Sequence, residues 1–92
     1  MMSLATAARA VSLSTTVRCD GLDYDRLFVH RPTDHDLRPA PPAMTDEDVC
    51  RLLIARICRV PLDVIRSLGP ADETRVLDAV EPMLRLAHQR GA

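Results

Sequence analysis

The sequence contains no lysine, asparagine or tryptophan, and its only aromatic residues are Tyr24 and Phe28. A core built from aliphatic side chains alone lacks the large rings that usually anchor small domains. A chain of 92 residues also buries a smaller fraction of its surface than a longer one. We therefore expect a single domain with a thin core, for which a partner or self-association would be an advantage.

An excess of basic charge is also missing, because twelve arginines are offset by thirteen acidic residues and the formal net charge is −1. Such a chain has no global positive field that would attract nucleic acid. No stretch approaches the roughly 18 apolar residues of a membrane span. The N-terminus lacks the pattern of a secretion signal. We expect a cytoplasmic protein with no nucleic-acid, membrane or small-molecule partner.

Glycine and cysteine are scarce, with three residues of each. Three scattered glycines do not form a phosphate-binding loop. The cysteines, Cys19, Cys50 and Cys58, form no CxxC pair, which argues against a zinc site and against a disulfide framework. We expect all three to be small buried residues in a reducing compartment.

The first third of the chain has the pattern of a β-hairpin. Asp20-Gly21 is a strong two-residue turn signal, because glycine accepts a positive φ without penalty. The pattern predicts a hairpin over 11–31, in which strand 11–19 pairs with strand 22–31 and Pro32 ends the pairing. In the first strand, Val11, Leu13, Thr15, Val17 and Cys19 alternate with polar residues. In the second strand, Leu27 and Val29 lie on one face and Phe28 on the other. Residues 1–10 are expected to be disordered.

The segment 28–37, FVHRPTDHDL, holds two of the three histidines. His30 and His35 could converge on a metal with Asp34 or Asp36 as a third ligand, and His35 with Asp36 could form a catalytic pair. No second cluster supports either reading, and the spacing matches no zinc pattern. We therefore predict no catalytic residue, no metal ligand, no cofactor and no enzyme activity.

A structural role is the favoured interpretation of the same segment. Thr33 or Asp34 can cap a single helical turn, after which Leu37 docks against the core. Residues 38–44, RPAPPAM, have three prolines in four positions, which favours an extended connector or arm.

Residues 46–60 have the pattern of a helix. Thr45 is a good N-cap, and three acidic residues follow it at the positive end of the helix dipole. The apolar residues cover an arc of about 180°, which is wider than one core contact requires. This helix is either central in the fold or has a second apolar surface for a partner. The arc consists of Val49, Cys50, Leu53, Ile54, Ile57, Cys58 and Val60.

Two further helices are predicted, over 62–68 after Pro61 and over 70–89 after Gly69. In the last helix, Pro82 falls on the polar side, where it is expected to bend the helix. Glu81 and Arg85 are spaced for a surface ion pair, and His88 is expected to interact with the negative C-terminal end of the helix dipole. Its apolar stripe is Val76, Leu77, Ala79, Val80, Met83, Leu84 and Ala87. A helix-turn-helix is the alternative for 61–88, but the first turn of the last helix, Ala71-Asp72-Glu73, would repel phosphate.

These elements define an α+β fold with one domain over 11–92, made of the hairpin, the connector at 38–44 and a helical part over 45–89. The order of motifs resembles the small tail assembly chaperones of long-tailed bacteriophages and prophages. The resemblance rests on Gly21 before Tyr24, on Leu27-x-Val29-x-Arg31-Pro32-Thr33 with Asp36-Leu37, on LLIARICRVP at 52–61, and on Asp72 near the start of the last helix. Arg59 departs from the family pattern, which commonly has a small residue or glycine there, and the connector is unusually rich in proline.

The resemblance implies a non-enzymatic protein that binds the tape measure protein, keeps it soluble in the bacterial cytoplasm until tail tube subunits replace it, and is absent from the mature particle. Tail tube assembly components would be further partners, and self-association stays open. A client that is helical needs an apolar groove. Leu53, Ile57, Val80 and Leu84 are our candidates for it, with a plain core role as the competing reading. A structural tail subunit and a regulatory module are the alternative functions.

Overall fold

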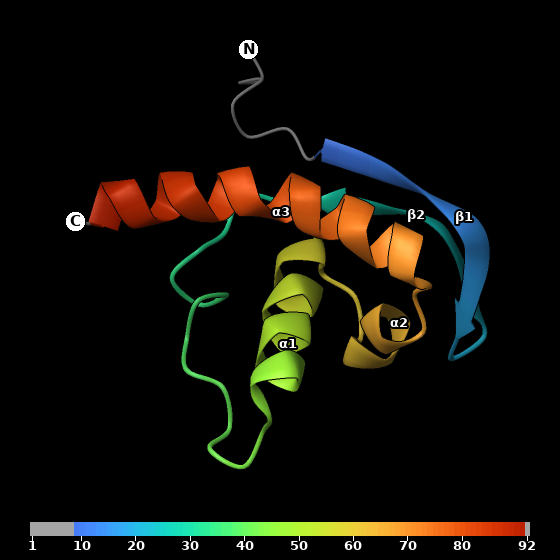
Figure 1. The fold of residues 1–92 in the computed structure, drawn as a ribbon, viewed down its shortest axis with the longest axis horizontal. Coiled ribbons are helices and arrows are strands. Elements are labelled where there is room, and N and C mark those ends of the chain that lie inside the picture. Colours follow the sequence, from blue (N-terminus) through green and yellow to red (C-terminus); the bar gives the residue numbers. More distant parts are fainter. Residues whose placement is uncertain (1–8, 92) are drawn as a thin grey trace.

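The computed structural model describes residues 9–91, with side chains described for residues 9–85. Two strands are followed by three helices, which confirms the α+β fold class. In Figure 1 the hairpin curves along one side of the molecule, α3 extends across it, and α1 runs crosswise to α3. The elements are β1 (Arg9–Cys19), β2 (Leu22–Val29), α1 (Asp46–Cys58), α2 (Leu62–Arg66) and α3 (Pro70–Gly91).

The hairpin turns where the sequence predicts it. Asp20 and Gly21 both have positive φ, at 53° and 80°, which is the geometry that matches the twist of paired strands. The strand ends differ from the prediction by two residues at both free ends. At the start of β1, Arg9 and Ala10 pair with β2, although they were expected to be disordered. At the other end, β2 stops at Val29, because the His30 amide donates to the Ile57 carbonyl at 3.2 Å. The rest of the predicted disordered segment, 1–8, lies outside the described residues.

The pairing between the strands is interrupted by a bulge that the alternation did not predict. Ser12 pairs with Arg26, but the next pair is Val17 with Tyr24, so residues 13–16 stand opposite Asp25 alone. An interruption of this kind leaves backbone amides without a partner strand. The amide of Ser14 finds its acceptor elsewhere, on the side chain of Asp72 in α3.

The core lies between the inner face of the hairpin and the three helices. The inward positions of β2 are those expected, since Leu27 and Val29 are buried while Phe28 is 45% exposed. The buried apolar residues come from all five elements and contain no aromatic ring: Val11, Val17, Leu27, Val29, Ile54, Ala55, Ile57, Cys58, Val64, Ile65, Val76, Ala79 and Val80.

Helix α1 begins as predicted and ends two residues earlier. The Thr45 hydroxyl accepts a hydrogen bond from the Asp48 amide at 3.2 Å, which satisfies one of the free donors of the first turn. Arg59 adopts a left-handed conformation with φ 61° and ψ 41°, and the Val60 amide then donates back to the Ala55 carbonyl at 3.1 Å. Glycine usually occupies this position of a helix end. Arg59, where the resemblance leads one to expect a small residue or glycine, thus has a backbone geometry that favours glycine.

The remaining helices follow the prediction closely. Pro61 is the N-cap of α2, which ends at Arg66 rather than Leu68, and α3 continues to Gly91. Pro82 is exposed within α3, and Glu81 pairs with Arg85 at 3.9 Å. No helix in the described part of the chain is long and apolar enough to cross a membrane. The predicted interaction of His88 lies outside the described side chains.

Candidate interaction surface

The segment 28–37 forms a capped turn, as the structural interpretation predicts. The Thr33 hydroxyl accepts from the Asp36 amide at 3.2 Å, and the Asp36 carboxylate accepts from the Thr33 amide at 2.9 Å. The prediction that Leu37 docks against the core is wrong, because Leu37 is 40% exposed while Asp36 is 3% exposed. The reciprocal cap directs the carboxylate inward, so the next side chain points out.

Asp36 is held by the end of α1 as well as by its own turn. Arg59 donates to its carboxylate at 2.8 Å. Burial alone would raise the pKa of Asp36, but the hydrogen bond from the Thr33 amide and the nearby charge of Arg59 lower it below its usual range. The ionised carboxylate therefore joins the turn after the hairpin to the left-handed residue that ends α1.

Asp72 fixes the bulge of β1 in the same way. Its carboxylate accepts from the amide of Ser14 at 3.0 Å and from the Ser14 hydroxyl at 3.0 Å, and it pairs with Arg75. The hydrogen bond from the Ser14 amide lowers the pKa of Asp72 to about 2, with the Arg75 and Ser14 side chains acting in the same direction. The start of α3 is thus attached to the hairpin.

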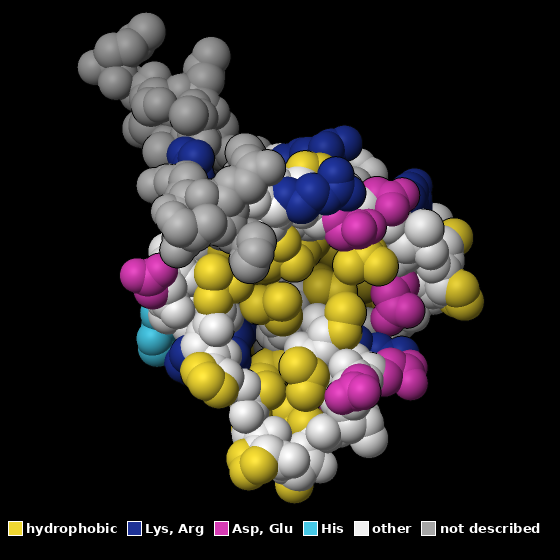
Figure 2. Space-filling view, turned by 60° about the vertical axis from the view of Figure 1, so that its left-hand side comes forward, with side chains coloured by type: hydrophobic (Ala, Val, Ile, Leu, Met, Phe, Trp, Pro, Cys, Tyr) yellow, Lys and Arg dark blue, Asp and Glu magenta, His cyan; other side chains and the backbone are white. Residues whose placement is uncertain are grey.

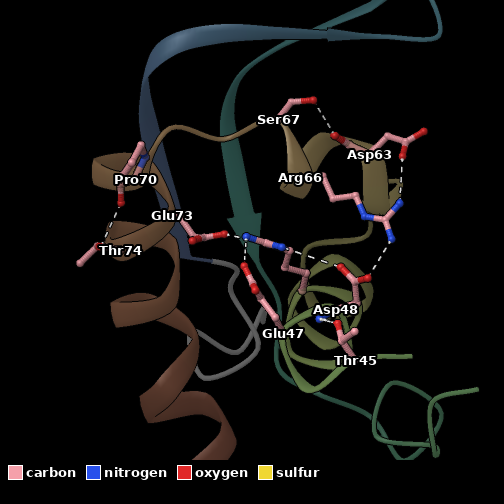
Figure 3. A network of polar contacts seen from close by, with 10 residues as sticks. Thr45, Glu47, Asp48, Asp63, Arg66, Ser67, Pro70, Glu73 and Thr74 are labelled. Carbon is pink, nitrogen blue, oxygen red and sulfur yellow. Dashed lines mark hydrogen bonds and ion pairs between the residues drawn. The ribbon is translucent and has the colours of Figure 1, made fainter. Parts of the chain in front are cut away.

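An ion-pair network joins the three helices around Arg51. Figure 3 shows Glu47 of α1 and Glu73 of α3 turned toward the same guanidinium group, and Arg66 of α2 turned toward Asp48 of α1. Arg51 lies 2.6 Å from Glu47 and 3.2 Å from Glu73, and Arg66 lies 3.3 Å from Asp48. Because Asp72 and Glu73 are both engaged within the fold, the first turn of α3 is not presented as a recognition helix would be.

The described histidine, cysteine and carboxylate side chains bear on whether the chain has a metal site or a reactive thiol. No group of three or more histidine, cysteine or carboxylate residues that could hold a metal ion occurs in the part of the chain that the structure describes. The prediction that all three cysteines are buried is wrong, since Cys50 is exposed and Cys19 is half-buried. Burial raises the pKa of Cys58 to about 11, so this thiol stays protonated at neutral pH and is a poor nucleophile.

Two apolar grooves flank the N-terminal half of α1. The larger groove has a volume of about 220 Å³ and lies between α1 and the loop after the hairpin. We name it the arginine groove, and its lining includes Leu37, Arg38, Ala40, Val49, Leu53 and Arg56. The smaller, with about 100 Å³, lies between α1 and α3 and is lined by Glu47, Cys50, Arg51, Ile54, Glu73 and Leu77. Figure 2 shows hydrophobic side chains gathered in a hollow of the surface, with acidic and basic side chains along one margin.

The four residues predicted from the sequence to form the partner surface fall into two pairs. Ile57 and Val80 are fully buried, at 0% exposure, and belong to the core. Leu53 and Leu84 are half-buried and pack against the core from outside. Of the four, Leu53 lines the arginine groove. The contact of a partner with any of these residues stays a prediction, and only Leu53 and Leu84 are accessible in this conformation.

Other residues of the grooves were not singled out from the sequence. The wide arc of α1 did contain Val49 and Cys50, which are exposed on its outer side, so the alternative of a second apolar surface had a signal. Leu37, Arg38 and Arg56 had none. They reach the groove because the capped turn directs Leu37 outward and because the Arg56 guanidinium donates to the Arg38 carbonyl at 2.7 Å, which holds the loop beside α1.

Comparison with known proteins gives one family. A family model described as "Phage tail assembly chaperone proteins, E, or 41 or 14" matches residues 10–85. The matched range includes the hairpin, the connector, α1, α2 and most of α3. Neither curated proteins nor solved structures give a match.

Proposed function

Because this chain belongs to the phage tail assembly chaperone family, in agreement with the resemblance seen in its sequence, we propose that it binds the tape measure protein of its phage and keeps it soluble while the tail is assembled. It acts in the host cytoplasm by binding alone, without catalysis. Tail tube subunits displace it, and it is absent from the finished particle.

The family match over residues 10–85 carries this proposal. The geometry supports it in two ways. Apolar side chains remain accessible on the outer side of α1, at Val49 and Leu53, where a client that is itself apolar can dock. The two buried carboxylates, Asp36 and Asp72, are occupied by hydrogen bonds that stabilise the fold, so they are not free to act on a substrate.

The test is co-expression of the tagged chain with the tape measure protein of the same phage genome, followed by purification of the tagged chain from the soluble fraction. Leu53→Asp is the informative variant, because Leu53 is half-buried in the groove. Leu22→Asp is its matched control, because Leu22 is 60% exposed at the hairpin turn, away from α1. Circular dichroism of each variant shows whether it folds.

The proposal predicts that the wild type and Leu22→Asp bring the client into the soluble fraction and co-purify with it. It predicts that Leu53→Asp folds but loses the client. A client that stays insoluble beside abundant wild-type chain would contradict a chaperone role. Detection of the chain in purified particles would instead favour a structural tail subunit.

A further inference from the structure

The arginine groove combines an aliphatic lining with two cations. Leu37, Val49 and Leu53 supply the apolar surface, and Arg38 and Arg56 lie beside it. No acidic residue contributes to its lining. The smaller groove on the other side of α1 differs in this respect, because Glu47 and Glu73 line it and both pair with Arg51.

Like Arg9 and Arg31, the two arginines of the groove form no ion pair with a carboxylate in the described range. Ion pairs among residues 9–85 involve Arg18, Arg26, Arg51, Arg59, Arg66, Arg75 and Arg85. Within that described range, Arg38 and Arg56 donate to main-chain carbonyls only, to those of His35 and Arg38, each at 2.7 Å. Residues 1–8 and 86–92 contain no aspartate or glutamate that could supply a partner. Neither Arg38 nor Arg56 therefore forms an ion pair with an aspartate or glutamate of this chain.

Arg56 also has an unused donor. Its Nε is the buried side-chain polar atom without a hydrogen-bond partner in the described part of the chain. A buried donor left without an acceptor destabilises a protein. Nη1 donates to the Arg38 carbonyl, and the buried Nε can donate to a client carboxylate only if that carboxylate displaces the side chains that cover it.

From these observations we propose that the arginine groove binds a helical segment of the client in which an acidic residue lies one turn from a pair of aliphatic residues. The aliphatic side chains enter between Leu37, Val49 and Leu53, and the carboxylate pairs with Arg38 and Arg56. The inference rests on the proposed function for the identity of the client, and it adds the chemistry that the client segment must have.

The other candidates for this groove are a segment of this chain and a second copy. The segments of this chain at 1–8 and 86–92 carry no acidic side chain, so neither could place an aspartate or glutamate beside the two arginines. A second copy could offer its hairpin turn, where Leu22 is exposed beside Asp23 and Asp25. Those carboxylates lie near arginines of their own hairpin, Asp23 at 3.5 Å from Arg18 and Asp25 at 3.8 Å from Arg26, so a second copy is kept as an outcome of the test.

An array of overlapping peptides that covers the tape measure protein tests the proposal directly. The wild type, Arg38→Glu, Val49→Glu and the control Arg26→Glu are applied to the array, and the strongest peptide is then titrated in solution by fluorescence anisotropy. Arg38→Glu spares the fold because this side chain is exposed and bonds only within its own turn. Val49→Glu adds an acidic residue to the first turn of α1, where the helix dipole tolerates it. Arg26 is an exposed arginine of the hairpin.

The peptides that bind the wild type should share an acidic residue one turn from two aliphatic residues. Arg38→Glu and Val49→Glu should weaken the strongest peptide by about tenfold or more, and Arg26→Glu by less than about twofold. Exchange of the acidic residue of the peptide for lysine should abolish binding to the wild type and restore binding to Arg38→Glu. This reversal is a result that a mere loss of folding could not produce.

Equal binding of all four proteins, or a set of bound peptides without acidic residues, would overturn the proposal. So would a concentration-dependent self-association that the two groove variants abolish while peptide binding persists, because the occupant would then be a second copy. Co-expression separates the two hypotheses. If the groove variants keep the client soluble as the wild type does, the chaperone role stands and the groove assignment fails. If the wild type does not keep it soluble, the chaperone role fails and the peptide titration alone decides the groove.

Discussion

Arg59 allows two opposing contributions to stability to be measured at one residue. Its backbone is left-handed, at φ 61°, and its side chain donates to the buried carboxylate of Asp36 at 2.8 Å. Arg59→Gly relieves the backbone strain and removes the hydrogen bond. Arg59→Ala removes the hydrogen bond and keeps the strain, so it is the matched control.

The magnitudes predict which contribution is larger. A non-glycine residue in this conformation costs about 1 kcal/mol. A hydrogen bond between charged groups contributes about 1.5–3 kcal/mol. We take about 1–2 kcal/mol here, because the Arg59 side chain is 46% exposed and Asp36 keeps its bond from Thr33. Arg59→Ala should therefore lower the free energy of unfolding by about 1–2 kcal/mol, and Arg59→Gly by about 0–1 kcal/mol.

Urea denaturation followed by circular dichroism measures both changes against the wild type. The expected order of stability is wild type, then Arg59→Gly, then Arg59→Ala. If Arg59→Gly proved more stable than the wild type, the hydrogen bond to Asp36 would be weaker than the strain, and the structural role assigned to this pair would be refuted. If the two variants were equally stable, the left-handed backbone would carry no measurable cost.

Three further predictions follow from the same structure. Because the pKa of Asp72 is lowered from 3.8 to about 2 in the folded chain, the unfolded state binds the proton more readily, and thermal stability should fall as the pH drops through this interval. Asp72→Asn should flatten this part of the curve of stability against pH. A curve that this variant leaves unchanged would contradict the hydrogen bond to Ser14. In urea denaturation, Ile57→Ala should lower the free energy of unfolding by about 2–5 kcal/mol, because Ile57 is fully buried, whereas Val49→Ala should lower it by less than about 1 kcal/mol. Similar losses at the two positions would contradict the burial of Ile57 and the exposure of Val49. The exposed Cys50 should react with a thiol reagent in the folded protein, and the buried Cys58 only after denaturation, as peptide mass mapping would show; early labelling of Cys58 would argue against its burial.

Local signals in the sequence were enough for most of the secondary structure. Asp20-Gly21 turns the hairpin and Thr45 caps α1, because both depend on residues within one turn of the chain. The end of α1 was placed too late because Arg59, unlike glycine, gives no sequence signal for a left-handed conformation. The alternation of residues did not predict the bulge in β1, because the bulge is held by a distant group, a carboxylate 58 residues away that accepts a hydrogen bond from the Ser14 amide.

The candidate surface was only partly predictable, because part of it depends on contacts between residues that are far apart in the sequence. The width of the apolar arc on α1 predicted either a central position in the fold or a second apolar surface, and the exposed Val49 and the half-buried Leu53 both line the arginine groove. The contribution of the loop could not be read from periodicity, because it depends on Asp36 turning inward to Arg59 and on Arg56 holding the Arg38 carbonyl. Ile57 and Val80 fit the same helical stripes, yet the packing of the three helices buries them completely.

The central claim is that this chain keeps the tape measure protein from aggregating by binding to it. The most direct measurement is light scattering after the purified tape measure protein is diluted from urea into buffer that contains increasing amounts of this chain. The account predicts that scattering falls with each addition and reaches a floor at a fixed molar ratio, without ATP, and that Leu53→Asp shifts the curve to higher concentration while Leu22→Asp does not. Scattering that is unchanged by a large molar excess of folded wild-type chain would contradict it.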